Sequence, residues 1–280
     1  MTVNEKAEKS IIKTYRSCIW NKFIQAIKNY DLIQDGDRIA VCISGGKDSF
    51  LMAKLFCELK KHGKQNFEPV YISMDPGYNK ENREKIEYNA KLLQLDIKYF
   101  QTDIFGVTEK VAGNPCYLCA RMRRGHLYSF AKENGCNKIA LGHHFNDVIE
   151  TTLMGMLYSG QYATMMPKLK STNFEGMELI RPLYCIKEDD IKKWAKFNGL
   201  EFIACACRLT EKAANGEMES YRLKTKNLIA QLKKEDPLVD INIFKSAHNV
   251  SLDQVIEYKQ NGVRHNFRER YNTQERLKEE

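Results

Sequence analysis

The feature that most constrains this chain is a short apolar run that leads directly into a glycine pair and then into a helical pattern. Residues 38–43 are rich in β-branched side chains, which is typical of a strand buried on both faces of a parallel sheet. The next six residues are Ser44, Gly45, Gly46, Lys47, Asp48 and Ser49. The apolar spacing of residues 50–62 then predicts a helix. A strand, a glycine-rich turn and a helix in succession begin a βαβ unit, so this segment predicts an α/β fold.

The same alternation continues along the chain. Further strands are predicted at residues 69–74, 97–101, 138–141, 179–183 and 201–204, and further helices at residues 80–93, 120–134, 146–158 and 187–198. Strands that alternate with helices predict a doubly wound parallel sheet with helices on both faces.

Two attachments flank this sheet. A single amphipathic helix is predicted over residues 5–32, because its apolar residues follow a helical period. The charged segment after residue 209 predicts a helical extension. Its last part, residues 264–280, is polar enough to predict a solvated helix or a partly disordered tail. We therefore expect an N-terminal helical segment (1–34), a nucleotide-binding catalytic domain (35–208) and a charged helical extension (209–280).

The glycine turn has the chemistry of a phosphate site. Glycines let the backbone approach phosphate oxygens, and the start of the following helix offers N–H groups and a favourable dipole. Ser44 and Ser49 add hydroxyl donors, Lys47 adds a cation, and Asp48 adds a carboxylate for Mg²⁺. The order differs from a Walker A loop. It resembles the PP-loop of the N-type ATP pyrophosphatases, which cleave ATP between its α and β phosphates, so the resemblance implies that this chain binds ATP.

Candidate ligand-binding residues also follow two other predicted strands, at the edge where ligands of open α/β sheets collect. Asp75 ends the second strand and is a candidate contact for ribose, adenine or Mg²⁺, with a turn cap as the alternative. Gly142 permits close approach of a nucleotide after the fourth strand. His143 and Asp147 place an imidazole and a carboxylate near the phosphates, although a histidine at a strand end also serves structural hydrogen bonding.

The cysteines suggest metal or redox chemistry. The polar first ten residues and the lack of any run of about 18 apolar residues favour a cytoplasmic protein without a membrane span. The nine cysteines would be kept reduced there. Cys116 and Cys119 form a Cys-x-x-Cys pair, and Cys205 and Cys207 follow the last predicted strand. Their spacing alone leaves a zinc site, a redox disulfide and an iron–sulfur cluster open. The other cysteines lie in apolar patterns and are expected to be core residues: Cys18, Cys42, Cys57, Cys136 and Cys185.

Several separated segments together resemble the tRNA 2-thiocytidine synthetases. They are Cys-Tyr-Leu-Cys-Ala-Arg-Met-Arg-Arg-Gly-His-Leu-Tyr, Lys-Ile-Ala-Leu-Gly-His-His-Phe-Asn-Asp, Met-Met-Pro-Lys-Leu and Ile-Arg-Pro-Leu, all between residues 116 and 188. With the PP-loop, the similarity covers roughly residues 15–208. It implies a [4Fe–4S] cluster held by Cys116, Cys119 and Cys205. The chain departs from the family where Ala204 replaces a proline before Cys205, which leaves Cys207 as a substitute or fourth ligand.

The resemblance also implies a reaction. ATP, bound with Mg²⁺, would adenylate the C2 oxygen of a tRNA pyrimidine, and the expected target is a cytidine in the anticodon loop. Sulfur from a cysteine desulfurase or from free sulfide would then replace the AMP. Asp48, Arg123 and Asp147 are the candidate catalytic residues. A net charge of +8 suits a tRNA partner, and a homodimer is expected only by analogy.

Two alternatives remain open at this point. Related cluster-dependent enzymes thiolate a tRNA uridine, but they are usually flanked by zinc ribbons, and this chain has no cysteine before Cys18 or after Cys207. The other alternative is a zinc-stabilised ATP-binding RNA module without thiolation activity.

Overall fold

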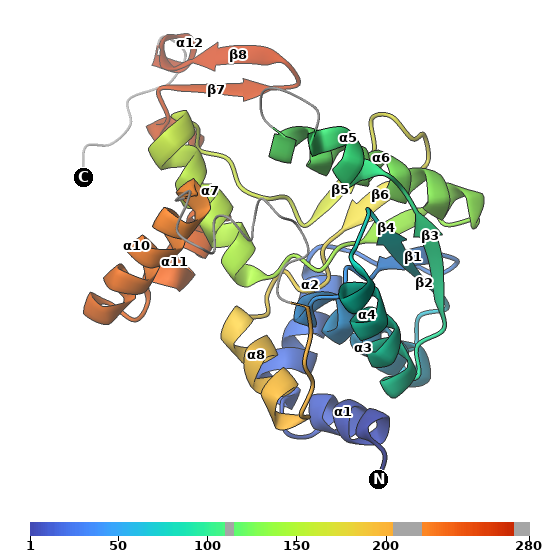
Figure 1. The fold of residues 1–280 in the computed structure, drawn as a ribbon. Helices are drawn as coiled ribbons and strands as arrows, with labels where there is room; N and C mark the ends of the chain where they lie inside the picture. The colour runs from blue at the N-terminus through green and yellow to red at the C-terminus, as the bar shows by residue number, and fades with distance from the viewer. Residues whose placement is uncertain (110–114, 204–219, 272–280) are drawn as a thin grey trace.

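A six-stranded sheet forms the centre of the computed structural model, which describes residues 1–109, 115–203 and 220–271 (Figure 1). Its strands are β1 (Arg38–Cys42), β2 (Glu68–Asp75), β3 (Ile97–Gln101), β4 (Lys138–Ala140), β5 (Lys168–Lys170) and β6 (Glu178–Ile180). They lie in the order β3-β2-β1-β4-β6-β5, and all neighbours are parallel except the antiparallel pair β5 and β6. The predicted doubly wound parallel sheet is confirmed, with one short antiparallel strand at its edge that the sequence analysis did not predict.

Helices lie on both faces of this sheet, with α3 (Lys47–His62) against one face and α6 (Pro115–Glu133) against the other. The other helices of the α/β region are α4 (Lys80–Leu92), α5 (Ile104–Glu109), α7 (Phe145–Ser159) and α8 (Glu188–Phe197). Successive side chains of β1 point to opposite faces. Ile39 and Val41 belong to an apolar cluster with residues of α3, α4 and α8. Ala40 belongs to a second apolar cluster, which contains Tyr128 and Ala131 of α6. The central strand is therefore buried on both sides, as its continuous apolar run predicts.

The N-terminal segment is broken into three pieces, so the single predicted helix over residues 5–32 is wrong. The pieces are α1 (Val3–Ile12), a π-helical turn η1 (Arg16–Trp20) and α2 (Asn21–Asn29). The wider π turn rotates the chain so that Ile11 and Ile19, both 0% exposed, face the same core. The Tyr15 hydroxyl donates to the Lys193 carbonyl at 3.0 Å and holds the break against α8.

The predicted strand at residues 201–204 is also wrong over the described residues 201–203. The carbonyl of Glu201 accepts a hydrogen bond from the Asn89 side chain at 2.8 Å. Phe202 stacks on Phe50 of α3, with ring centroids 5.3 Å apart. These contacts hold the segment over α3 and α4, away from any sheet edge.

The first described elements of the C-terminal extension are two helices, α10 (Tyr221–Glu235) and α11 (Val239–Ser246), which lie beside α7 (Figure 1). Ile229 of α10 is buried with Phe145 and Ile149 of α7. A 3-10 turn η2 (Leu252–Gln254), an antiparallel hairpin of β7 (Glu257–Gln260) and β8 (Val263–Asn266), and α12 (Phe267–Tyr271) follow. The hairpin replaces the start of the predicted polar tail, and residues 272–280 lie outside the described residues. Its turn is Asn261-Gly262, where both residues have positive φ, as a tight hairpin turn requires.

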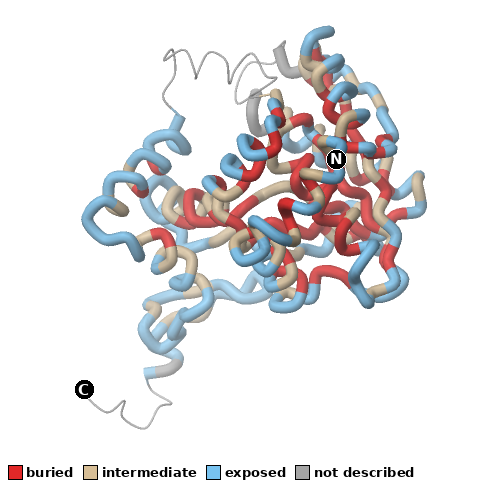
Figure 2. The backbone as a smooth tube through the Cα atoms, turned by 90° about the horizontal axis from the view of Figure 1, so that it is seen from below, coloured by how far each residue is buried: buried red, intermediate tan, exposed pale blue. Residues whose placement is uncertain are grey.

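Burial separates the sheet and its helices from the C-terminal extension (Figure 2). Buried residues run through the α/β layers, whereas α10 and the hairpin carry mostly exposed residues and α11 carries mainly half-buried and exposed ones. Across the described ranges, no helix has both the length and the apolar character needed to cross a membrane.

Candidate functional site

The sheet order places a topological switch point between β1 and β4. From β1 the chain proceeds outward to β2 and β3, then returns to β4 on the other side of β1 and continues to β6. In open α/β sheets, ligands bind in the crevice at the carboxyl ends of the strands where the order reverses. The segment 44–49 follows β1 and the segment 142–147 follows β4, so the fold brings these two predicted segments together.

The turn after β1 is held in shape by its own serines. The Ser49 hydroxyl donates to the Gly46 carbonyl at 2.8 Å and accepts from the Ser44 backbone N–H at 3.2 Å. Gly45 has φ +90°, which side-chain-bearing residues rarely adopt. Gly46 precedes α3, and among the described residues no side chain caps the first turn of this helix. The N–H groups of that turn are therefore available to an anion.

Asp48 has the geometry of a cation ligand. Its Oδ2 accepts from the Lys47 ammonium at 3.1 Å. Its Oδ1 is buried and has no hydrogen-bond partner in the described part of the chain, and the ring nitrogen Nε2 of His144 lies 3.8 Å from it. An unpartnered buried carboxylate oxygen is costly unless a ligand satisfies it, and carboxylate oxygen is the donor that Mg²⁺ prefers.

Gly142 forms the opposite wall of this crevice. A Cβ added there would lie 3.3 Å from the Ser49 backbone nitrogen and 3.4 Å from the Asp48 carbonyl carbon. These contacts are tighter than ordinary van der Waals packing, so the missing side chain lets β4 and the PP-loop pack closely.

The two histidines after β4 point in different directions. His143 accepts from Arg181 Nε at 3.3 Å, and burial, followed by the nearby Arg181, lowers the pKa of His143 to about 4. His144 instead lies between Asp48 and Asp147. It caps α7, because the Asp147 N–H donates to His144 Nδ1 at 3.4 Å and the His144 N–H donates to Asp147 Oδ2 at 2.9 Å. Sequence reasoning selected His143 from the pair and missed the contact of His144 with the loop.

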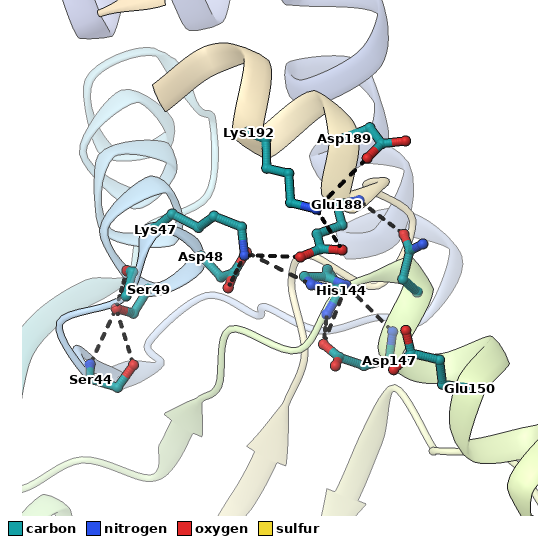
Figure 3. Close-up of polar contacts among 12 residues, drawn as sticks. Ser44, Lys47, Asp48, Ser49, His144, Asp147, Glu150, Glu188, Asp189 and Lys192 are labelled. Atoms are coloured by element: carbon teal, nitrogen blue, oxygen red, sulfur yellow. Dashed lines mark hydrogen bonds and ion pairs between the residues drawn. The ribbon is translucent and has the colours of Figure 1, made fainter. Parts of the chain in front are cut away.

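Glu188, at the start of α8, is a second site residue that the sequence analysis missed. Its Oε1 lies 3.3 Å from Lys47 Nζ, and its Oε2 lies 3.1 Å from Lys192 Nζ. Figure 3 shows Lys47 and Asp48 of α3, His144 before α7 and Glu188 of α8 converging on one another. Burial works to raise the pKa of Glu188, but Lys226, Lys47 and Lys192 outweigh it and lower this pKa to about 2. The available signal was its position in the first turn of a predicted helix, just after the Ile-Arg-Pro-Leu segment.

Asp75 and Arg123 approach the loop from the other side, through Tyr78. Asp75 Oδ1 accepts from the backbone N–H groups of Gly77 and Tyr78 at 2.9 and 2.7 Å, so it acts as a turn cap in this structure. The Tyr78 hydroxyl donates to the Ser44 carbonyl at 3.3 Å and accepts from Arg123 at 3.4 Å. Arg123 Nε is buried and, within the described ranges, has no hydrogen-bond partner, so this guanidinium retains donor capacity beside the loop.

The cysteine pair lies at the start of α6. Cys116 is in its first turn, where side chains are not described, and Cys119 is half-buried. Helical spacing places Cys119 on the face that carries Arg123, because residues four positions apart share one face. Cys205 and Cys207 lie outside the described residues. In the ranges the structure does cover, no three metal-binding side chains cluster. Of the five expected core cysteines, Cys42 and Cys136 are buried and the other three are half-buried.

Comparison with known proteins agrees with this geometry. A family model described as the PP-loop domain matches residues 16–209. The tRNA-cytidine(32) 2-sulfurtransferase of Geotalea uraniireducens is 34% identical over 248 residues, which are 86% of this chain and 96% of that protein. The protein of the same name from Syntrophotalea carbinolica is 34% identical over 229 residues, 81% of this chain and 86% of that protein.

A solved structure shares the fold. The U34-tRNA thiolase NcsA from Methanococcus maripaludis, with its [4Fe-4S] cluster, superposes with a TM-score of 0.65 at 23% identity, covering 81% of this chain and 76% of that one. The family model and the relatives match most of this chain, and the strand-to-helix loop lies at the switch point. This chain therefore belongs to the PP-loop family and to the group of relatives named tRNA-cytidine(32) 2-sulfurtransferases.

Proposed function

We propose that this protein is an ATP-dependent tRNA 2-thiolation enzyme that replaces the C2 oxygen of a cytidine with sulfur. The observation that carries the proposal is the match to a tRNA-cytidine(32) 2-sulfurtransferase over 96% of that relative's length, in a chain whose PP-loop residues meet at the switch point. tRNA is the proposed substrate, and the activity is placed in the cytoplasm.

ATP binds at the carboxyl ends of β1 and β4 in this proposal. The open first turn of α3 and the Lys47 ammonium hold the phosphates, and Gly142 leaves room for them beside the loop. Asp48, with its unpartnered buried Oδ1, holds the Mg²⁺ that accompanies ATP. His143 and Asp75 remain proposed nucleotide contacts. In this structure their partners are Arg181 for His143, and the turn amides and Arg83 for Asp75.

Activation precedes substitution, because the C2 oxygen of a pyrimidine is a poor leaving group. The base oxygen attacks the α phosphorus of ATP, the bond between the α phosphorus and the bridging oxygen breaks, and pyrophosphate leaves. Sulfide then forms a bond to C2, and AMP departs with the former carbonyl oxygen. Lys47 and Asp48 align the triphosphate for in-line attack, and Asp147 holds His144 beside Asp48. The Arg123 guanidinium stabilises negative charge that develops on the adenylated base.

The proposed [4Fe–4S] cluster is held by Cys116, Cys119 and Cys205, with Cys207 as the competing third ligand. When bound by three thiolates, such a cluster supplies an open iron that can hold the incoming sulfide. Cys119 is proposed for this role because its half-buried side chain lies on α6, the helix that also carries Arg123, which reaches toward the loop through Tyr78. The sulfur donor, a cysteine desulfurase or free sulfide, and a homodimeric assembly belong to the proposal as well.

The test combines metal analysis with product analysis. Protein purified without oxygen is compared with Cys116→Ala, Cys119→Ala, Cys205→Ala and Cys207→Ala, and with Cys136→Ala as a matched control from the buried core. We expect about four irons per chain, lost in the first three variants and retained in Cys207→Ala and the control. Mass spectrometry of nucleosides from tRNA incubated with protein, MgATP and sulfide should show ATP-dependent 2-thiocytidine.

Each contrary result has a defined meaning. Formation of 2-thiouridine in place of 2-thiocytidine would assign the uridine-modifying alternative. One tightly bound zinc without iron, and no thiolated nucleoside, would overturn the proposal in favour of a zinc-stabilised RNA module.

A further inference from the structure

Helix α10 brings two cations of the C-terminal extension to the edge of the PP-loop site. The helix is anchored by Ile229, which is buried against Phe145 and Ile149 of α7. Thr225, 0% exposed, lies between Arg222 and Lys226 in the sequence and faces the same packed side. The two cations therefore emerge from a fixed helix, and their positions follow from its packing.

Both cations are paired with acids that also contact the loop or its neighbours. Arg222 Nη2 lies 2.8 Å from Asp147 Oδ1, and Arg222 Nε lies 2.9 Å from Glu150 Oε2, one turn further along α7. Lys226 Nζ lies 2.7 Å from Glu188 Oε2. The other oxygen of Glu188 binds Lys47 of the PP-loop, so Lys226 and Lys47 are separated by a single carboxylate.

The charge balance of the site depends on α10. Among its described side chains, the carboxylates are Asp48, Asp147, Glu150 and Glu188, and the cations paired with them are Lys47, Lys192, Arg222 and Lys226. Without the two α10 cations, these four carboxylates would keep only Lys47 and Lys192 of their four cationic partners. Loss of the two cations would therefore weaken the attraction of the site for a triphosphate.

We propose that Arg222 and Lys226 bind the β and γ phosphates of ATP, so that the C-terminal extension completes the nucleotide site. In the free protein Glu150, Asp147 and Glu188 hold the two side chains in place, and a triphosphate in the crevice competes for them. A guanidinium matches two phosphate oxygens at once, and Lys226 acts beside Lys47 as a second point charge. The inference rests on the proposed ATP site, and it assigns that site a specificity for the terminal phosphates over AMP.

The experiment measures nucleotide binding by calorimetry without tRNA. Wild type, Arg222→Gln, Lys226→Gln and the double variant are titrated with MgATP, magnesium pyrophosphate and AMP at one ionic strength. Lys234→Gln is the control, because it removes the same charge from an exposed position of the same helix. We expect each site variant to weaken ATP and pyrophosphate binding roughly tenfold, the double variant to weaken it further, and AMP binding to change by less than about twofold.

The outcomes distinguish failure of this inference from failure of the proposed ATP site on which it rests. If the site variants lost ATP and AMP binding equally, the proposed role of α10 would be overturned. The same would follow if they bound ATP as tightly as wild type and the Lys234→Gln control do. Wild-type protein that binds neither ATP nor AMP would instead overturn the proposed nucleotide site. Lys226→Arg keeps the charge and the helix, so it should bind ATP nearly as wild type does. A loss as large as that of Lys226→Gln would show that packing, and not charge, is responsible.

Discussion

The adjacent glycines of the PP-loop should respond in opposite ways to alanine. Gly46 has φ −82°, and among the described atoms the nearest to an added Cβ is Ser44 Oγ at 3.9 Å, so the fold itself does not require glycine there. Gly46→Ala should cost at most about 1 kcal/mol of stability, the difference between glycine and alanine before a helix. The methyl group would project where phosphate oxygens approach the helix start, so ATP affinity should fall at least about tenfold, or 1.4 kcal/mol.

Gly45 is constrained by the fold instead. Its φ is +90°, and an added Cβ would lie 2.6 Å from Ile203 Cδ1 and 2.7 Å from Ile86 Cγ1. The backbone conformation costs about 1 to 2 kcal/mol for alanine, and forced repacking adds about 1 to 3 kcal/mol. Gly45→Ala should therefore lower the free energy of unfolding by about 2 to 5 kcal/mol.

Urea unfolding and calorimetric titration with MgATP, applied to both variants, test this contrast. A Gly46→Ala protein that is as stable as wild type and binds ATP equally well would refute the phosphate cradle. A Gly46→Ala protein destabilised as much as Gly45→Ala would show that both glycines serve the fold.

Three further predictions follow from other contacts. Gly142→Ala should weaken ATP binding, because its Cβ would lie 3.3 Å from the Ser49 nitrogen, whereas Gly125→Ala, with no described atom within 4 Å, should bind ATP normally in the same titration. The Glu188 ion pairs should contribute stability that is complete above the unfolded pKa of 4.5 and is lost as pH falls through the folded pKa of about 2. The difference in unfolding free energy between wild type and Glu188→Gln should thus shrink between pH 5 and about pH 2; a constant difference would contradict it. Lys54→Met should destabilise the protein by about 2 to 4 kcal/mol in urea, because Lys54, 1% exposed, is bonded to Glu8, Asn4 and the Leu93 carbonyl; unchanged stability would mean that the buried network is dispensable.

The elements that the sequence predicts well are those whose signal is local. The run from Ile39 to Ile43 and the glycine turn after it specify a buried strand and a helix start within a dozen residues, and both lie where they were expected. The prediction of a single helix over residues 5–32 was wrong because a π turn changes the helical phase without interrupting the apolar pattern. The hairpin at β7 and β8 was missed even though Asn261-Gly262 is a strong turn signal, because the flanking residues are polar.

The site was only partly predictable, because its completing residues come from distant segments. The PP-loop and Asp147 carry recognisable patterns, whereas nothing near Arg222 indicates a nucleotide. His143 and His144 cannot be distinguished by sequence, since only the packing against Arg181 and the capping of α7 decide which ring meets Asp48. Glu188 pairs with Lys192 one turn along its own helix, but its contacts with Lys47 of α3 and Lys226 of α10 join distant segments, which no local pattern encodes.

The long sequence separation between α7 and α10 has a consequence for biosynthesis. Asp147 and Arg222 are 75 residues apart in the chain. At ordinary rates of translation, Arg222 is added roughly 4 to 15 s after Asp147. A nascent chain can therefore form the sheet and the PP-loop while Asp147 and Glu150 still lack their arginine. Docking of α10 is then the step that neutralises these acids, and a ribosome-bound intermediate should carry an acidic surface that the finished protein covers.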